Sequence, residues 1–231
     1  MAKNQDQNQK ITVLKNGPYM VSGNIPLFQA TIECDNSGTP SRWIMGEPLK
    51  TAQNYTLCRC GQSKTKPFCD GSHIKVNFDG TEASDNEPFQ IMAKEINGPE
   101  LKLQDAEILC ASARFCHRGG DIWAVMAKTG DPKWRSNAVE NSSDCPSGRL
   151  VLVDKNTNVA FEPKLERSIG FILDKGMAVD GPLWIRGGIP VYSAKGELYE
   201  VRNRVTLCRC GKSTNKPFCD SSHYPEEDRE R

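Results

Sequence analysis

The chain has 231 residues, with 30 Lys plus Arg against 29 Asp plus Glu, so its formal net charge is only +1. A near-neutral chain has no electrostatic footprint for nucleic acid, so we expect no nucleic-acid partner. No stretch approaches the roughly 18 consecutive apolar residues that a membrane span needs, so we expect no membrane partner either.

Cysteine usage points to a reducing compartment. The ten cysteines make up about 4% of the chain, well below the roughly 8–10% that marks a disulfide scaffold. Nine of the ten stand in groupings typical of metal ligands. The first residues, MAKNQDQNQK, contain no apolar signal region and no arginine-rich amphipathic pattern. We therefore expect a cytoplasmic protein.

Runs of β-branched and aromatic residues, interrupted by Gly, Pro and Asn, predict a strand-rich chain. In chain order the predicted strands cover 11–14, 18–21, 27–33, 49–57, 150–153, 159–162, 189–192, 198–201 and 204–207. Helices should be short, with one over 133–141. Asp70 and Asp220 stand where an N-cap would begin a further helical turn, whose N–H groups would face a nearby anionic group.

An 18-residue segment occurs twice. TLCRCGQSKTKPFCDGSH (56–73) and TLCRCGKSTNKPFCDSSH (206–223) differ at only four positions. Each copy has the spacing Cys-x-Cys, eight residues, Cys, three residues, His. The predicted metal ligands are Cys58, Cys60, Cys69 and His73 in the first copy, and Cys208, Cys210, Cys219 and His223 in the second.

Three thiolates and one imidazole suit either zinc or an iron–sulfur cluster, and they exclude calcium and magnesium, which prefer oxygen ligands. Structural zinc sites usually take their thiolates from knuckles with two to four residues between ligands. Here a closely spaced Cys-x-Cys pair precedes a loop of eight residues. This spacing favours a cluster with two metal ions, each held by one pair of ligands. A [2Fe–2S] cluster fits this spacing better, and structural zinc remains the alternative.

The pattern Cys-x-Cys-x-x-Ser/Thr-x-x-x-Pro-x-Cys-Asp-Gly-x-His is similar to that of the CDGSH iron–sulfur proteins, the mitoNEET family. That resemblance implies [2Fe–2S] clusters held by three Cys and one His. The first copy matches at every pattern position, whereas the second has Ser221 where the pattern has Gly. Because Gly adopts positive φ readily and Ser seldom does, we expect the second loop to be strained there.

Basic residues surround both motifs: Arg59, Lys64, Lys66, Arg209, Lys212 and Lys216. They would offset the negative charge of a cluster with thiolate ligands. The alternative for each is a solvated basic loop.

The repeat extends upstream of the ligands. GPYMVSGNIPL (17–27) is echoed by GPLWIRGGIPV (181–191), and the first unit carries an insertion around CDNSGTPSRWIMGEP that reads as a loop or an extra hairpin. Members of the resembled family with a single motif are homodimers. The resemblance therefore implies that two units in one chain form an intrachain pseudo-dimer, and we expect a monomer.

The region between the units contains three further cysteines, Cys110, Cys116 and Cys145, the last followed by Pro as in the final ligand of bacterial ferredoxins. The stretch 108–153 resembles the divergent ferredoxin-like single-cluster domain that is often fused to CDGSH motifs. That family typically has His two residues after its first Cys, where this chain has Ser112.

Three cysteines could hold a third cluster, either [3Fe–4S] or a [4Fe–4S] cluster with an outside ligand. His117 and Cys34 are the candidates for that fourth ligand. The alternative is that the three cysteines are buried thiols, because free Cys packs as a small hydrophobe. Cys34 itself has no partner in the sequence and is otherwise an inert thiol.

These observations predict a β-rich α+β protein with two small CDGSH-type β units, at 11–80 and 178–224, and a central ferredoxin-like insert at 100–165. The function we expect is electron transfer, cluster transfer or redox sensing, with a redox or cluster-acceptor protein as partner. A histidine ligand raises the reduction potential of a cluster relative to four thiolates. No nucleotide fingerprint, Ser-His-Asp set or flavin site is recognisable, so we do not expect an enzyme.

Overall fold

The computed structural model describes residues 8–229, so most of the N-terminal stretch used above to predict localisation lies outside the described residues. The strands form three sheets, and the helices are short except for one in the central region. The β-rich α+β class predicted from the sequence is confirmed. No helix within residues 8–229 is both long and apolar enough to cross a membrane.

The first sheet combines strands from both ends of the chain. Its order is β12-β1-β2-β5, with β1 at Lys10–Val13, β2 at Tyr19–Ser22, β5 at Tyr55–Leu57 and β12 at Val191–Tyr192. Alternate residues of these strands are buried, as a sheet with one face on the core requires. Strand β12 belongs to the second unit but pairs in parallel with β1 of the first.

The second sheet repeats this arrangement with the units exchanged. Its order is β13-β11-β10-β3-β4, with β3 at Leu27–Cys34, β4 at Pro40–Met45, β10 at Ser168–Asp174, β11 at Val179–Arg186 and β13 at Arg204–Leu207. Strand β3 of the first unit pairs in parallel with β10, which lies just before the predicted second unit (178–224) and pairs with its β11, just as β12 pairs with β1. The two units thus exchange a strand, which gives the chain a pseudo-twofold axis.

One hydrophobic core joins the two units. Ile11, Val21 and Leu57 of the first unit are packed with Ile185 and Leu207 of the second, and all five are at most 2% exposed. Neither unit can bury its strands without the other, so the intrachain pseudo-dimer expected from the repeat is present.

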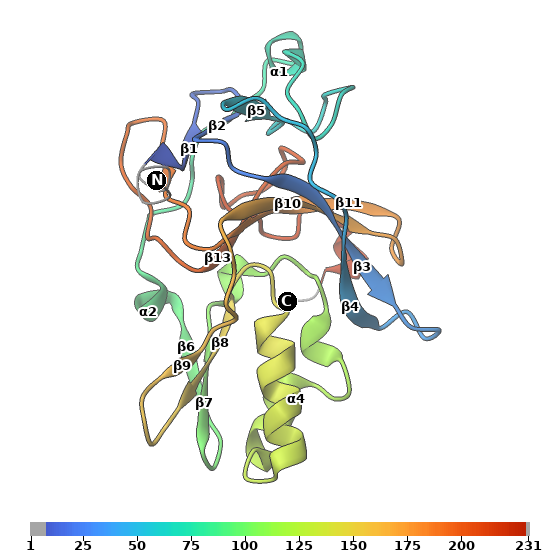
Figure 1. Ribbon diagram of the computed structural model, residues 1–231, viewed down its shortest axis with the longest axis vertical. Coiled ribbons are helices and arrows are strands. Elements are labelled where there is room, and N and C mark those ends of the chain that lie inside the picture. The colour runs from blue at the N-terminus through green and yellow to red at the C-terminus, as the bar shows by residue number, and fades with distance from the viewer. Residues whose placement is uncertain (1–7, 230–231) are drawn as a thin grey trace.

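The central region forms a layer of its own beneath the second sheet (Figure 1). Its sheet has the order β6-β7-β8-β9, with strands at Lys94–Asn97, Leu101–Asp105, Leu150–Asp154 and Ala160–Phe161. The helix α4, Pro132–Ser143, packs on β8 and begins where Asp131 accepts a hydrogen bond from the Lys133 N–H (2.8 Å), with Pro132 at the first helical position. Shorter helical turns complete this layer: η3 (Glu107–Leu109), η4 (Phe115–His117), α3 (Ile122–Val125) and η5 (Met126–Lys128).

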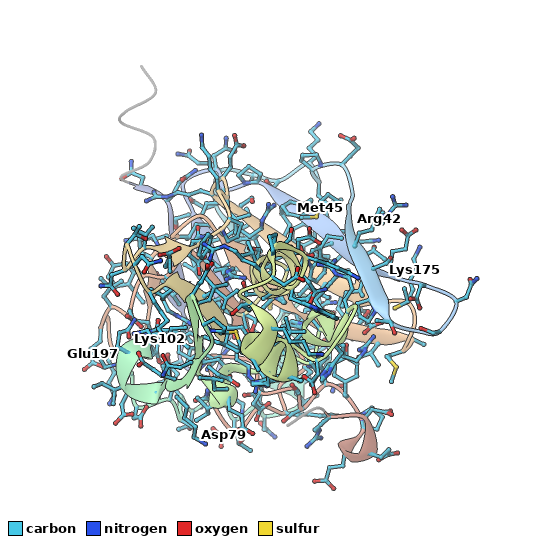
Figure 2. The ribbon with its side chains drawn as sticks, turned by 90° about the horizontal axis from the view of Figure 1, so that it is seen from below. Arg42, Met45, Asp79, Lys102, Lys175 and Glu197 are labelled. Atoms are coloured by element: carbon cyan, nitrogen blue, oxygen red, sulfur yellow. The ribbon has the colours of Figure 1, made fainter. Side chains whose placement is uncertain are left out.

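The inserted hairpin of the first unit supports the contact between the layers. Trp43 of β4 lies against Phe115 of the central region (ring centroids 4.9 Å apart) and Trp184 of β11 (4.8 Å), and its indole N–H donates to the Asp144 carbonyl (3.1 Å). Arg42 and Met45 of the same strand lie at the outer edge of the molecule (Figure 2). The insertion therefore closes one side of the junction between the second sheet and the central region.

Several predicted elements differ from the observed ones. The predicted strand over 49–57 is limited to Tyr55–Leu57, and the strand over 198–201 was wrong, since that stretch contributes only an isolated bridge between Leu198 and Tyr192. Strands β6, β7, β10 and β11 were not predicted. The helix α1, Ser72–Lys75, carries His73 as expected, but its N-cap is Gly71. The second motif has only turns at the equivalent place, so the N-cap prediction for Asp220 was wrong. The remaining short elements are α2 (Phe89–Met92) and η6 (Glu226–Asp228).

Candidate metal centres

The first motif follows directly from β5 and brings its four predicted ligands together as two pairs. The Cys58 and Cys60 Sγ atoms lie 3.8 Å apart, and the Cys69 Sγ lies 3.4 Å from Nδ1 of His73. Backbone hydrogen bonds from Cys58 N to Pro67 O (2.8 Å) and from Cys69 N to Thr56 O (3.0 Å) hold the loop against the strand. The pairing therefore depends on the strand that precedes the motif.

The second motif, which follows β13, has the same internal contacts. Cys208 and Cys210 Sγ lie 3.6 Å apart, and the Cys219 Sγ lies 3.5 Å from Nδ1 of His223. In both loops the motif aspartate accepts a backbone hydrogen bond from six residues earlier: from Lys64 to Asp70 (2.9 Å) and from Thr214 to Asp220 (2.7 Å). These bonds lower the pKa of both carboxyl groups, although burial partly opposes the effect at Asp220. The aspartate thus joins the two ends of the loop, and its other oxygen accepts from the N–H two residues later, that of Ser72 (3.0 Å) or Ser222 (3.1 Å).

The pair distances fit two-metal ligation. Two thiolates on one tetrahedral metal ion, each at about 2.3 Å, are roughly 3.8 Å apart, and a thiolate and an imidazole on one ion are roughly 3.6 Å apart. Both values match the observed pairs. Within residues 8–229, however, no three His, Cys, Asp or Glu side chains gather as a single-ion site would require. The donor sets therefore fit a cluster with one iron per pair better than a single zinc ion.

The two motifs meet across the pseudo-twofold axis. Cys60 and Cys210 form an isolated antiparallel bridge, and each is followed by a glycine with positive φ, Gly61 (+75°) and Gly211 (+79°). A Cβ atom at Gly61 would lie 2.4 Å from the Cys210 carbonyl oxygen, and one at Gly211 would lie 2.7 Å from that of Cys60. The sequence analysis did not single out these glycines, although their presence in both copies was the available signal.

The two sites differ in burial. Cys69 is partly exposed whereas Cys219 is 2% exposed; both ligand histidines are partly exposed, but the Nε2 atom of His223 is buried with no hydrogen-bond partner among the described residues. Burial, followed by the positive charge of Arg209, lowers the pKa of His223 to about 4. The imidazole is therefore neutral near pH 7, which is the form that binds a metal.

The arginines within the Cys-x-Cys segments are buried, whereas the lysines Lys64 and Lys66 are exposed. Arg59 donates to the Gly80 carbonyl (2.6 Å), and Arg209 donates to the carbonyls of Gly181 (2.5 Å) and Ile172 (2.9 Å). The alternative that these basic residues only form a solvated loop therefore holds for the lysines of the first motif. It does not hold for the two arginines, each of which places a fixed positive charge behind its ligand loop.

In the central region, the structure brings the three remaining predicted ligands together. Cys110, Cys116 and Cys145 line one small cavity. The Cys110 Sγ accepts a hydrogen bond from the Ser112 N–H (3.4 Å), and the Cys145 Sγ lies 3.5 Å from Ser147 Oγ. Residues up to 35 positions apart in the chain thus line the same cavity.

Neither residue suggested as the fourth ligand lines this cavity. His117 lies beside Asp121 (Nδ1 to Oδ1, 3.7 Å) and the Trp123 ring. Cys34 lies near the turn at Gly176, and burial together with the charge of Asp174 raises its pKa. The structure thus does not support either candidate, and the environment of Cys34 is that of an unreactive thiol.

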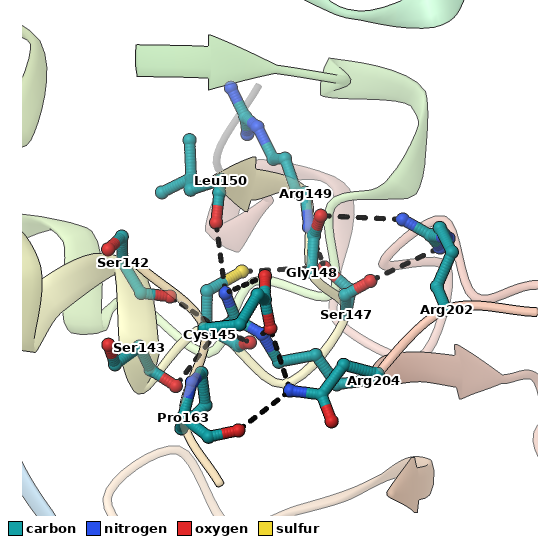
Figure 3. A network of polar contacts seen from close by, with 12 residues as sticks. Ser142, Ser143, Cys145, Ser147, Gly148, Arg149, Leu150, Pro163, Arg202 and Arg204 are labelled. Atoms are coloured by element: carbon teal, nitrogen blue, oxygen red, sulfur yellow. Dashed lines mark hydrogen bonds and ion pairs between the residues drawn. The ribbon is translucent and has the colours of Figure 1, made fainter. Parts of the chain in front are cut away.

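A buried arginine organises the loop that carries Cys145 (Figure 3). Arg204, which is 1% exposed, donates from Nη1 to the carbonyls of Ser143 (2.9 Å) and Cys145 (2.7 Å), and from Nη2 to that of Leu150 (3.2 Å). It also forms an ion pair with Glu162 (3.0 Å). Because Arg204 opens β13, the same strand supports the Cys145 loop and delivers Cys208.

Comparisons with known families agree with these sites. The family model described as iron-binding zinc finger CDGSH type matches residues 16–74 and 180–224, and the model described as divergent 4Fe-4S mono-cluster matches residues 96–155. No curated protein and no solved structure gave a significant match. The chain is therefore an iron–sulfur protein. It has two CDGSH [2Fe–2S] sites on either side of a divergent 4Fe–4S mono-cluster domain, which confirms the predicted cofactors.

Proposed function

We propose that the chain is an electron-transfer protein whose two CDGSH sites hold [2Fe–2S] clusters through three Cys and one His each. The observation that carries this proposal is the arrangement of both ligand sets as pairs at 3.4–3.8 Å, at the separations expected for two ligands of one iron. When bound, such clusters accept and release single electrons, and imidazole ligation raises their potential. We propose no substrate and no reaction of the chain's own, in line with the expectation that the protein is not an enzyme.

The central cluster, in this proposal, is held by Cys110, Cys116 and Cys145. The shared cavity supports this set, since the three cysteines line it together inside the region that matches the mono-cluster family. Arg149 lies beside this site, where its ion pair with Asp105 (2.6 Å) keeps it in place. A fixed cation next to three thiolates would offset part of their negative charge.

The first CDGSH site is where an external protein would exchange electrons. Its Cys69 and His73 are partly exposed, and the neighbouring Ile74 and Val76 are 72% and 49% exposed. Figure 1 shows α1 at the end of the molecule opposite the central region. We propose a small redox protein as the partner. We also propose a monomeric carrier, because the chain already contains both halves of the pseudo-dimer.

Anaerobic optical and EPR spectra, with iron and acid-labile sulfide counts, test this function. We expect visible absorption and about eight irons per chain, two for each [2Fe–2S] site and four for the central site. The variant Cys145→Ser should lose about four irons, while the control Cys34→Ser should lose none. A colourless protein with stoichiometric zinc would refute the proposal.

Cluster transfer is the second candidate function, favoured by the exposure of the Cys69–His73 pair. A cluster on that pair can be reached by an acceptor, whereas Cys219 is almost fully buried. If transfer occurs, an apo-ferredoxin mixed with the loaded protein should gain about one [2Fe–2S] cluster per chain, taken from the first site. Equal loss from both sites would contradict a role for exposure.

A further inference from the structure

The second CDGSH loop is hydrogen-bonded directly to the cysteine segment of the central region. The Ser221 hydroxyl donates to the Cys110 carbonyl (2.8 Å) and accepts from the Ser112 hydroxyl (2.7 Å). Ser221 is 2% exposed and Ser112 is 1% exposed, so water does not compete for these bonds. Two segments more than 100 residues apart are thus joined next to two sets of metal ligands.

Both serines stand at positions where this chain departs from the patterns of the families it resembles. Ser221 replaces the glycine of the CDGSH pattern, and Ser112 stands where the ferredoxin-like pattern has histidine. Both have left-handed backbones, with φ of +69° at Ser221 and +48° at Ser112. A left-handed backbone is unfavourable for a non-glycine residue, and the hydrogen bonds of Ser221 to the Ser112 hydroxyl and the Cys110 carbonyl offset this cost.

The first CDGSH loop has no such contact. Its equivalent of Ser221 is Gly71, with φ of +83°, and a Cβ atom added there would meet nothing within 4 Å. The contact with the central region is therefore specific to the second site, although the two ligand loops are otherwise alike.

We propose that Ser221 and Ser112 are positioning residues that join the central cysteine site and the second CDGSH site into one electron-transfer unit. This inference rests on the proposed function. Ser221 lies two residues after the ligand Cys219 in the same loop, and its hydroxyl donates to the Cys110 carbonyl, so a single residue connects the ligand loop of one site to a ligand residue of the other.

The electron count of this unit is simple. One electron leaves the central site, which is oxidised by one unit, and reduces the second CDGSH site by one unit, with no bond made or broken. The electron enters the central site from a low-potential one-electron donor protein. It leaves through the first CDGSH site, which adjoins the second through the Cys60–Cys210 bridge.

A separate set of contacts fixes the same two segments. Arg114 of the central region forms an ion pair with the fully buried Asp174 (2.6 Å) and donates to the Tyr224 hydroxyl (3.2 Å), while Tyr224 donates to Asp174 (2.7 Å). Tyr224 directly follows the ligand His223. Removing the serine hydroxyls should therefore leave the segments docked, which separates an effect on coupling from an effect on folding.

The first test uses EPR of the fully loaded, dithionite-reduced protein. We expect magnetic interaction with the central site to broaden the second-site signal and shorten its relaxation time, and we expect Cys145→Ser to abolish both effects. The first-site signal, isolated in a Cys208→Ser variant, should change less when Cys145→Ser is added. An equal response of the two CDGSH signals, or a central site that binds no iron while both [2Fe–2S] sites are loaded, would overturn the inference and leave the proposed function intact.

The second test measures the rate at which an electron equilibrates between the central and second sites after flash photoreduction. Ser221→Gly and Ser112→Ala should each slow this step severalfold with unchanged iron content. Gly71→Ser, the matched control in the first loop, should leave the rate unchanged. Wild-type rates in both serine variants would show that the hydroxyls only hold the loops together, and would overturn their assigned role.

Discussion

The glycines after the second cysteine of each motif allow the sharpest stability prediction. In Gly61→Ala the added Cβ would lie 2.4 Å from the Cys210 carbonyl oxygen, and the backbone would keep its φ of +75°. Gly61 directly follows Cys60, and Cys60 forms a bridge with Cys210 that joins the two ligand loops. The backbone at Gly61 and the Cys210 carbonyl therefore cannot move apart without separating the loops. The substitution therefore perturbs the pseudo-dimer at its centre.

The magnitude follows from two costs. A left-handed alanine costs about 1–2 kcal/mol relative to glycine, and overpacking against fixed backbone adds about 1–3 kcal/mol. The total is about 2–5 kcal/mol, which in a chain of this size lowers Tm by roughly 4–20 °C. Gly196→Ala is the matched control, since Gly196 has φ of +85° but its added Cβ would meet nothing within 4 Å. That control should lose only about 1–2 kcal/mol.

The assay is thermal unfolding of the loaded protein, followed in parallel by far-UV circular dichroism and by the visible absorption of the clusters. Gly61→Ala should lose absorption and structure at a clearly lower temperature than Gly196→Ala. If the two variants melt together, the close approach of the ligand loops does not contribute to stability, and the reasoning from the Cβ contact is wrong.

Three further predictions concern single side chains. His73→Cys should keep its cluster but lower its reduction potential in an EPR redox titration, because a thiolate adds negative charge; an unchanged potential would contradict ligation by His73. Arg204→Lys should lower the free energy of unfolding, measured by urea denaturation, by about 3–5 kcal/mol, because it breaks a buried network. The control is Arg202→Lys. The hydrogen bonds from Arg202 to carbonyls are 3.3–3.4 Å long, so this variant should lower the free energy of unfolding by less than about 1 kcal/mol. Ser221→Gly should not prolong the lifetime of the second cluster. The substitution relieves about 1–2 kcal/mol of backbone strain, but it also removes two hydrogen bonds of about 1 kcal/mol each. A longer lifetime would show that the backbone strain outweighs the hydrogen bonds.

The ligand pairs could be predicted from the sequence because they are local. Within each motif the spacing of the four ligands sets the pairs, and the hydrogen bonds that hold the loop come from the motif itself and from the adjoining end of the preceding strand. The positive φ expected at Ser221 is also a local property, inherited from the glycine of the pattern, and the structure confirms it.

The exchange of strands between units could not be predicted in the same way. The parallel pairs β1–β12 and β3–β10 join residues more than 130 positions apart, and no periodicity within a strand reports its distant partner. Strands β10 and β11 were also missed, because Gly170 and Gly181 interrupt them. A Cβ at Gly170 would lie 3.2 Å from that of Ala30, and one at Gly181 would lie 2.8 Å from Ile172 Cγ2, so these glycines permit close packing rather than turns.

Duplication of a motif would by itself produce two equivalent sites, as in a symmetric homodimer. The central region removes this equivalence, because it can cover only one side of the pseudo-twofold assembly. In the second loop Cys219 and Ser221 are buried and Ser221 contacts Cys110, while in the first loop Cys69 and Gly71 are partly exposed. A homodimer cannot make such a distinction, since any change to one motif would appear in both. Joining the two halves in one chain therefore allows one CDGSH loop to contact the central region while the other does not.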